Sequence, residues 1–298
     1  MMARQLTFSN FNRIQDVSLY DGDASAYDWV INTGKILNTN SSGGDMIMTL
    51  DETGGTHLSS TRYMHYGKIT ARMKTGRWGG VVTAFIMMSD VRDEIDWEWP
   101  GDAVTEGQTN YFWQGYVPEG TSNGHVETGL TDTYANFHDY TIDWQLKTLT
   151  WSIDGKVVRT LNEADTVDKK GVSHFPNTPS KVELSIWPAG IDGMAAGTVQ
   201  WGGGMINWND PDYKAAGHFY AIVRSITIEC SDSTERKVGV TAYTYSSNTS
   251  SQTPGIKLVN ASTLLSAVGN GAETIEGNSY SVRVTMATVV GLVISLLW

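Results

Sequence analysis

Three acidic residues alternate with apolar residues in the segment RDEIDWEWPG. On a β-strand, side chains two positions apart share a face, so Glu94, Asp96 and Glu98 would line one side and Trp97 and Trp99 the other. Carboxylates this close repel one another, which raises the proton affinity of at least one and separates their titrations. The pattern suits acid/base chemistry with an ionised nucleophile, a protonated acid and a middle carboxyl that hydrogen-bonds between them.

Cleavage of a glycosidic bond with retention uses two such carboxyls about 5 to 5.5 Å apart. Along an extended strand the backbones of Glu94 and Glu98 are about 13 Å apart, so both side chains must lean over Asp96, which a twisted sheet permits. A solvated acidic face and oxygen ligands for Ca²⁺ are the alternatives. Trp97 and Trp99 indicate a central strand that is buried on its other side, and such a strand would not carry repelling charges without a function, which favours catalysis. Calcium more often takes its ligands from loops than from a strand.

Apolar and polar residues alternate along most of the chain between about residues 15 and 230, with turn residues between the alternating stretches. Asp154 and Gly155 lie between two alternating arms and predict a hairpin turn. The content of 11 Trp, 13 Tyr and 31 Gly in 298 residues favours an all-β sandwich or barrel. The clearest predicted strands are 67–75, 79–89, 93–99, 109–116, 138–145, 148–161, 181–187 and 217–230.

The charge and the cysteine content limit the function classes. A net charge of -11 argues against nucleic-acid binding and suits a neutral or cationic partner such as a polysaccharide, although solubility alone would account for it. The chain has a single cysteine, Cys230, which cannot form an intrachain disulfide. This cysteine content favours a protein of a reducing compartment. Asn-X-Ser/Thr triplets at Asn40, Asn248 and Asn260 would be glycosylated only in a secreted chain.

Composition divides the chain into three parts. Residues 12–232 are predicted to form one catalytic domain, 233–283 a polar Ser/Thr-rich linker or tail, and 284–298 an apolar terminal segment. Small residues, a polar spacer and that segment together match a glycolipid-anchor signal; a buried last strand and a tail-anchor helix are the alternatives. The opening MMARQLTFSNFNR has no apolar h-region, so we expect the signal peptide to be absent from this chain.

Several segments together resemble glycoside hydrolase family 16, and within it the fungal Crh branch. EIDWE matches the E-x-D-x-E pattern of the family, and TNYFWQG, ANFHDYTIDWQLKTLTWSIDGKVVRTL and VELSIWPAGIDGMAAGTVQWGGGMINW match other parts. Members of the Crh branch are cell-wall transglycosylases that join chitin to β-glucans. The resemblance, over about residues 50–232, implies a concanavalin-like β-jelly-roll of two antiparallel sheets, with a substrate cleft across the concave sheet.

The resemblance also implies a role for each acid. Glu94 matches the nucleophile, Asp96 the auxiliary acid and Glu98 the general acid/base. By the same resemblance, Glu183, Trp187 and Thr198 lie near the bound sugar. Strand alternation agrees for Glu183 and Trp187, which share a face in KVELSIW.

We extend the predicted cleft to the aromatic and amide residues Trp78, Tyr111, Trp113 and Gln114, of which alternation lets only some face the ligand. His138 is expected to organise the cleft or core, because the carboxylates already supply both proton roles.

Together with the acid pattern, the resemblance implies a monomeric, retaining enzyme that acts on chitin and β-glucan and forms a glycosyl-enzyme on Glu94. It would need no cofactor and no metal, and would meet a membrane only through a glycolipid anchor. The alternatives are an endo-hydrolase of β-glucan or chitin and a non-catalytic carbohydrate-binding wall protein. The resemblance implies a secreted protein of the cell wall or surface, commonly with a disulfide to the cysteine that matches Cys230, whose partner is absent here.

Overall fold

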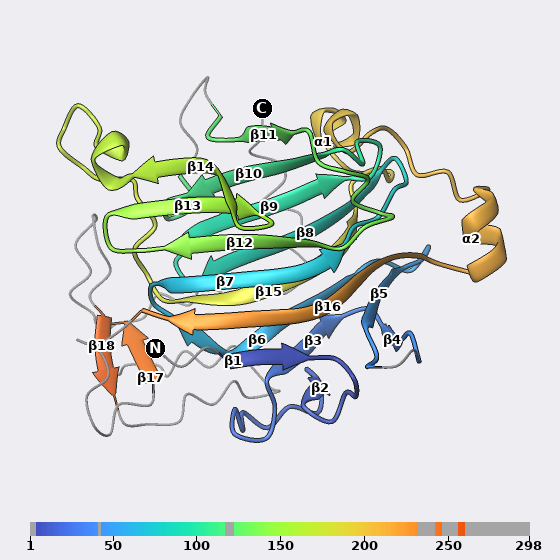
Figure 1. Cartoon of the computed structure of the whole chain (residues 1–298), viewed down its shortest axis with the longest axis horizontal. Helices are drawn as coiled ribbons and strands as arrows, with labels where there is room; N and C mark the ends of the chain where they lie inside the picture. The colour runs from blue at the N-terminus through green and yellow to red at the C-terminus, as the bar shows by residue number, and fades with distance from the viewer. Residues whose placement is uncertain (1–3, 41–42, 117–121, 232–241, 246–255, 260–298) are drawn as a thin grey trace.

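The computed structural model describes residues 4–40, 43–116, 122–231, 242–245 and 256–259. Two eight-stranded sheets pack face to face, with sheet A in front of sheet B in Figure 1. Neighbouring strands are antiparallel, except that β2 and β3 pair in parallel. The all-β prediction is confirmed within these residues, in which helices are few and short.

The element bounds follow the two sheets. Sheet A contains β1 (Arg4–Thr7), β4 (Ile36–Asn38), β5 (Met46–Leu50), β7 (Gly67–Lys74), β12 (His138–Trp144), β13 (Thr148–Ile153), β14 (Lys156–Asn162) and β16 (Phe219–Cys230). Sheet B contains β2 (Ile14–Asp16), β3 (Trp29–Thr33), β6 (Thr56–Met64), β8 (Val81–Ser89), β9 (Glu94–Pro100), β10 (Glu106–Phe112), β11 (His125–Thr128) and β15 (Ser180–Pro188). The remaining elements are η1 (Glu163–Thr166), α1 (Ala196–Trp201), α2 (Pro211–Ala216) and the paired strands β17 (Ala242–Tyr245) and β18 (Ile256–Val259).

Every stretch predicted from alternation contains a strand. The Asp-Gly hairpin is also confirmed, since Asp154 and Gly155 have φ of 49° and 79° between β13 and β14. Strand β1 pairs with β16 although it precedes residue 12, where the domain was predicted to begin. Strands β17 and β18 lie within the predicted linker, and the apolar segment 284–298 lies outside the described residues.

The acid strand β9 lies inside sheet B, between β8 and β10. Its side chains Ile95, Trp97 and Trp99 are buried between the sheets, as expected of a central strand. The rings of Trp97 and Trp99 stack with their centroids 5.7 Å apart, and Trp97 Nε1 donates to the backbone oxygen of Thr141 on sheet A. This packing fixes β9, so the opposite side chains, the three acids, face outward from sheet B.

Glycines allow three loops to cross where α1 joins the sandwich. The N–H of Gly80 donates to Gly202 O at 2.6 Å, and the N–H of Gly190 donates to Gly80 O at 2.9 Å. A Cβ on Gly190 would lie only 2.1 Å from Gly204 O, so a larger residue would push the loops apart. The crossing holds α1, and with it Trp201, beside the outer face of sheet B.

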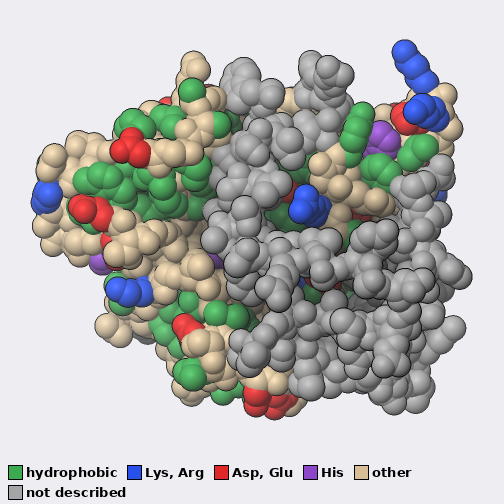
Figure 2. Space-filling view, turned by 180° about the vertical axis from the view of Figure 1, so that it is seen from behind, with side chains coloured by type: hydrophobic (Ala, Val, Ile, Leu, Met, Phe, Trp, Pro, Cys, Tyr) green, Lys and Arg blue, Asp and Glu red, His purple; other side chains and the backbone are tan. Residues whose placement is uncertain are grey.

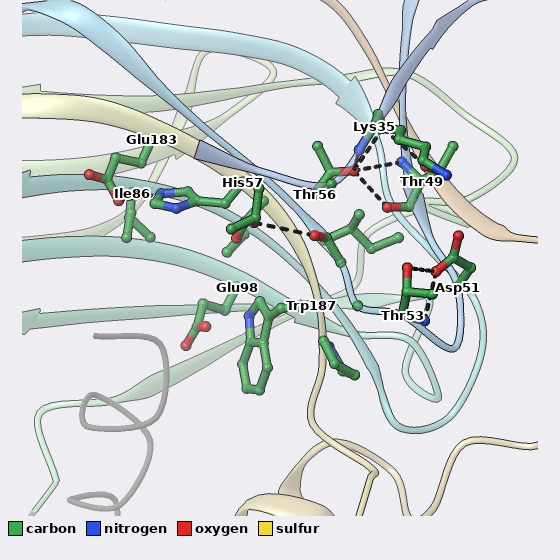
Figure 3. A pocket seen from close by; sticks show the side chains of 18 of the residues that line it. Lys35, Thr49, Asp51, Thr53, Thr56, His57, Ile86, Glu98, Glu183 and Trp187 are labelled. Atoms are coloured by element: carbon green, nitrogen blue, oxygen red, sulfur yellow. Dashed lines mark hydrogen bonds and ion pairs between the residues drawn. The ribbon is translucent and has the colours of Figure 1, made fainter. Parts of the chain in front are cut away.

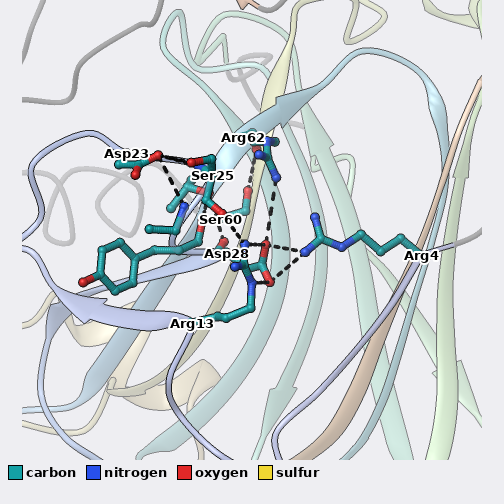
Figure 4. A network of polar contacts seen from close by, with 10 residues as sticks. Arg4, Arg13, Asp23, Ser25, Asp28, Ser60 and Arg62 are labelled. Atoms are coloured by element: carbon teal, nitrogen blue, oxygen red, sulfur yellow. Dashed lines mark hydrogen bonds and ion pairs between the residues drawn. The ribbon is translucent and has the colours of Figure 1, made fainter.

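Asp28, just before β3, joins the N-terminal strands to the sandwich (Figure 4). Its buried carboxylate accepts from Arg4 Nη2 at 2.7 Å and from Arg13 Nε at 2.6 Å, and Arg62 Nη1 lies 3.9 Å away. Burial opposes ionisation of Asp28, but the hydrogen bonds and charges of Arg13 and Arg4 outweigh it and lower the pKa. The carboxylate therefore stays ionised at neutral pH.

We predict that Asp28→Asn destabilises the protein by about 2 kcal/mol near neutral pH, because charged hydrogen bonds from two arginines are lost. The pKa is lowered in the folded state, so this stabilisation is present above the unfolded value and disappears as the pH falls through the folded one. Thermal melts should show a lower melting temperature at pH 7 and a smaller difference in acid. An equal difference at both pH values would contradict this role.

Candidate active site

Residues of neighbouring strands line up in rows across the outer face of sheet B. Glu98 on β9 lies opposite Ala84 on β8, Ala84 opposite Ser185 on β15, and Ser185 opposite His57 on β6. The small side chains in the middle of this row leave space between Glu98 and His57. The arrangement gives sheet B a groove that runs perpendicular to its strands.

A cavity of about 580 Å³ occupies this groove (Figure 3). Glu94, Glu98, Glu183 and Trp187 from the predicted site all line it. The other side chains and glycines of its wall are Thr33, Gly34, Lys35, Thr49, Asp51, Thr53, Gly54, Gly55, Thr56, His57, Ala84, Ile86, Met88, Ser185, Ile186, Pro188, Ile191 and Met194. Seen from behind, hydrophobic side chains gather toward the end of the molecule that carries α1 and α2 (Figure 2).

Asp96 lies below the cavity surface and hydrogen-bonds to Glu94. Burial raises the pKa of Asp96 well above its usual value, and the charges of Glu94 and Glu98 raise it further. Burial raises the pKa of Glu94 to about 8, the hydrogen bond from Asp96 lowers it, and the charges of Glu98 and Glu183 add to the rise. The two carboxyls titrate as a pair, in which the hydrogen bond raises the pKa of Asp96 and lowers that of Glu94, so Asp96 keeps the first proton of the pair and Glu94 is the member that ionises as the nucleophile.

Glu98 lies beside Trp187 in the cavity (Figure 3). Burial raises the pKa of Glu98 to about 7, although a hydrogen bond from the Trp187 side chain lowers it in part. A carboxyl with this pKa holds its proton in mildly acidic solution and releases it near neutrality. Glu98 can thus serve as an acid first and as a base afterwards.

Two further carboxylates organise the site. Asp93, just before β9, is buried and accepts hydrogen bonds from the N–H groups of Gln114 and Asn177, each at 2.8 Å. The carboxylate of Glu183 on β15 accepts from His57 Nε2 at 2.8 Å, and its charge raises the pKa of Glu94. Asp93 anchors the start of the acid strand, and Glu183 places a further negative charge near Glu94.

The wall near Glu98 is aromatic. The ring of Trp201 on α1 stacks on Trp187 with centroids 5.8 Å apart, and its Nε1 donates to Gln108 Oε1 at 2.8 Å. Gln108 lies opposite Glu98 in the β9–β10 register. Two stacked indoles beside a carboxyl form a surface suited to packing against a sugar ring.

The model of glycosyl hydrolases family 16 matches residues 23–208. The chain belongs to glycosyl hydrolase family 16. It is 37% identical to Crh-like protein 3 of Botryotinia fuckeliana, over 92% of this chain and 61% of that protein. It is also 37% identical to Congo red hypersensitive protein 2 of Saccharomyces cerevisiae, over 91% and 58%. The chain thus spans about three fifths of the length of these relatives.

Solved structures of family 16 agree with the fold. A Crh5 transglycosylase in complex with NAG superposes with a TM-score of 0.66 at 30% identity, over 86% of this chain and 92% of that one. The Bacillus licheniformis β-glucanase shares the fold, with a TM-score of 0.57 at 20% identity, over 77% and 98%. The predicted jelly-roll class is confirmed.

Some predicted cleft residues of this family 16 chain lie elsewhere. Trp78 does not line the described cavity, because it packs against Phe219 and donates to Asp212 Oδ2 at 3.0 Å. Tyr111 pairs with Ile95 in the register, so its side chain joins the buried core rather than the acid face. Neither side chain lines the cavity beside the acids, and a contact of either with the sugar stays a prediction.

Three other predicted residues lie close to the site but outside the cavity lining. Trp113 stacks on His174 with centroids 4.7 Å apart, and Gln114 is held by its backbone bond to Asp93. Thr198 is buried in α1, behind the wall that carries Trp201. Their roles in sugar binding stay predictions.

His138 does not line the cavity. It lies at the start of β12, an interior strand of sheet A, where its Nδ1 lies 2.7 Å from Asp154 Oδ2 and its Nε2 lies 2.9 Å from Thr131 Oγ1. This matches the organising role expected of it. His57 and Trp201 were missed, because neither stands in a sequence pattern that marks it as part of a site.

Two negative findings hold for the part of the chain that the structure describes. Its His, Cys, Asp and Glu side chains form no group of three or more arranged to hold a metal ion. No described helix is long and apolar enough to cross a membrane. Cys230 is a free, exposed thiol at the end of β16.

We predict that kcat/KM falls as the pH rises through about 7, because Glu98 must be protonated to release the leaving group. The hydrogen bond from Trp187 lowers the pKa of Glu98, so Trp187→Phe should move this alkaline limb to higher pH. Trp201→Phe keeps an aromatic ring without touching that bond and serves as the control. A limb that stays in place in Trp187→Phe would contradict the assignment of Glu98.

Proposed function

We propose that this protein is a retaining transglycosylase of β-linked cell-wall polysaccharides, which joins chitin to β-glucan. The observation that carries the proposal is that Glu94 and Glu98 line one cavity, while the buried Asp96 between them hydrogen-bonds to Glu94. The relatives named above support the choice of a transglycosylase within the family. A carbohydrate-binding protein would not need three neighbouring acids on one strand face whose pKa values are all raised.

The reaction has two steps. Glu98 protonates the glycosidic oxygen while the Glu94 carboxylate attacks the anomeric carbon, so that the leaving chain departs and a glycosyl-enzyme forms. Glu98, now ionised, then removes a proton from a hydroxyl of the acceptor sugar, whose oxygen attacks the anomeric carbon and releases Glu94. Asp96 stabilises the Glu94 carboxylate through its donated proton before attack and after release.

The apolar lining favours transfer to a sugar over hydrolysis. Ile86, Met88, Ile191, Met194 and Trp187 line the cavity beside the acids. Apolar walls bind the faces of sugar rings and leave water few hydrogen-bonding partners near the glycosyl-enzyme. An acceptor sugar seated against Trp187 and Trp201 would displace water at the step that decides the product.

The place of action is part of the same proposal. A polysaccharide of the wall is met at the cell surface, which is consistent with the sequons and with an anchor signal in 284–298. The anchor segment, Asn248 and Asn260 lie outside the described residues, and Asn40 lies in the loop after β4. We propose that the protein acts there as a monomer.

Product sizing tests the reaction. The protein is incubated with chitin oligomers and a fluorescently labelled glucan acceptor, and the labelled products are separated by size. Labelled products longer than the acceptor are expected, and Glu94→Gln should produce none. Shortened, unlabelled sugars alone would establish an endo-hydrolase, and binding without any product would establish a carbohydrate-binding protein.

A further inference from the structure

One arginine joins the two sheets behind the acid strand. Arg159 lies on β14, an edge strand of sheet A, and its side chain crosses to β10 of sheet B. Its Nη1 donates to Thr109 O at 2.8 Å and to Thr109 Oγ1 at 2.9 Å, and its Nη2 donates to Asn123 O at 2.7 Å. Arg159 does not line the described cavity, so it can act on the site only through other residues.

The guanidinium of Arg159 lies on an indole that contacts the middle acid. Its Cζ is 4.5 Å from the centroid of the Trp151 ring, a distance typical of a cation–π contact. Trp151 is fully buried between the sheets, and its Nε1 donates to the backbone oxygen of Asp96 at 3.0 Å. Arg159 therefore packs on the ring whose N–H holds the backbone of β9 at Asp96.

A second chain of contacts leads from Arg159 to β9. Thr109, which accepts from Arg159, lies opposite Trp97 in the β9–β10 register. The Thr109 hydroxyl donates in turn to the buried Glu127 on β11 at 3.2 Å. Burial lowers the pKa of Arg159, and nearby charges, among them that of Glu127, raise it, so the guanidinium stays protonated.

The positive charge of Arg159 acts on Asp96. Burial is the largest cause of the raised pKa of Asp96, and the charges of Glu94 and Glu98 raise it further. The charge of Arg159 lowers the pKa of Asp96, whereas that of Glu183 on β15 raises the pKa of Glu94. The buried Oδ1 of Asp96 has no hydrogen-bond partner in the described chain, so this carboxyl is sensitive to the charges around it.

We propose that Arg159 is a positioning residue of the active site, which holds Asp96 through Trp151 and supplies a positive charge behind that acid. Without this charge, Asp96 would hold its proton more firmly and donate a weaker hydrogen bond to Glu94. The inference rests on the proposed function, because that hydrogen bond matters where Glu94 has to ionise before it attacks. Since Arg159 lies outside the cavity, its loss should affect the chemical step rather than sugar binding.

Two variants of Arg159 separate its charge from its packing. The release of the leaving group from an activated chitin oligomer, a step that a hydrolase and a transglycosylase share, is measured across a range of pH. Arg159→Gln loses the charge, so kcat should fall about tenfold and its acidic limb should move to higher pH, while KM stays unchanged. Arg159→Lys keeps the charge, so its acidic limb should stay at the wild-type pH. Arg72→Gln, which loses an arginine bonded to Asp139 on β12, is the matched control.

Trp151→Phe tests the contact between the indole and the acid strand. Phenylalanine keeps an aromatic ring beside the guanidinium but lacks the N–H that donates to Asp96 O. The kcat of Trp151→Phe should therefore fall, whereas its acidic limb should stay in place because the charge of Arg159 remains.

The outcomes separate a positioning role from a structural one. A wild-type acidic limb in Arg159→Gln, a raised KM with an unchanged kcat, or equal losses in Arg159→Gln and Arg159→Lys that follow their melting temperatures would each overturn the inference. If Arg159→Gln does not fold, Trp151→Phe decides: a lowered kcat of the folded enzyme supports the inference, and a wild-type kcat overturns it. An inactive wild type would refute the proposed function, whereas an active wild type with unaffected Arg159 variants would refute the inference alone.

Discussion

Glu94→Gln and Glu98→Gln are each expected to lower turnover by about 10³-fold or more while the fold persists. Gln cannot attack the anomeric carbon at position 94 and cannot exchange a proton at position 98, so each variant loses one step of the reaction. The side chains stay nearly isosteric, and Trp97 and Trp99 on the other face of β9 are untouched. Initial rates with a chitin-oligomer donor and a labelled acceptor measure the effect.

Thermal melts provide the control for folding. Because burial raises the pKa of Glu98 to about 7, the ionisation of Glu98 opposes folding, and the stability present below about pH 4.5 is reduced as the pH rises through 7. Glu98→Gln should therefore melt at a higher temperature than the wild type at pH 8 and at a similar temperature at pH 4. Glu229→Gln, on β16 of sheet A, should keep full activity. Normal turnover in Glu94→Gln or Glu98→Gln would refute the catalytic assignment.

Replacement of Asp96 should show whether it acts through the hydrogen bond that it donates to Glu94. Asn at position 96 still donates to Glu94, so Asp96→Asn should retain activity within about tenfold of the wild type. Asp96→Leu removes the donor from a buried carboxylate, which costs about as much as one charged hydrogen bond and should lower kcat about 100-fold. The kcat of the two variants, measured with the same donor, makes the comparison.

The pH dependence of kcat provides a second test of the two Asp96 variants. Loss of the donated hydrogen bond raises the pKa of Glu94, so Asp96→Leu should lose activity at a higher pH on the acidic side than Asp96→Asn does. Equal kcat values in the two variants would mean that Asp96 does not act through Glu94.

The strands of the sandwich's centre could be predicted because their two faces differ. In β7 and β15, buried and partly exposed residues alternate, and in β9 the tryptophans mark the core side. Strand β6 was not predicted, since its buried residues include Ser59, Ser60 and Thr61, whose polar side chains hide the alternation. Short strands such as β2 and β4 have too few residues to show any period.

The site residues that share one strand could be predicted from the sequence, whereas those that come from other elements could not. Glu94, Asp96 and Glu98 follow from the two-residue period of β9. His57 and Lys35 reach the cavity from β6 and from a loop, and Trp201 reaches Trp187 from α1. Only the cross-strand register and the glycine-dependent loop crossing bring these residues together. Trp78 shows the converse, because an aromatic residue next to a predicted strand packs in the core as readily as in a cleft.

Trapping the glycosyl-enzyme tests the central claim most directly. In Glu98→Gln, a chitin oligomer with an activated leaving group needs no acid for the first step, whereas the second step lacks its base, so the intermediate accumulates. After proteolysis, mass spectrometry should find one glycosyl group on the peptide that contains Glu94, attached to Glu94 itself. An adduct on another residue, or rapid release of the leaving group with no adduct, would contradict a retaining mechanism through Glu94.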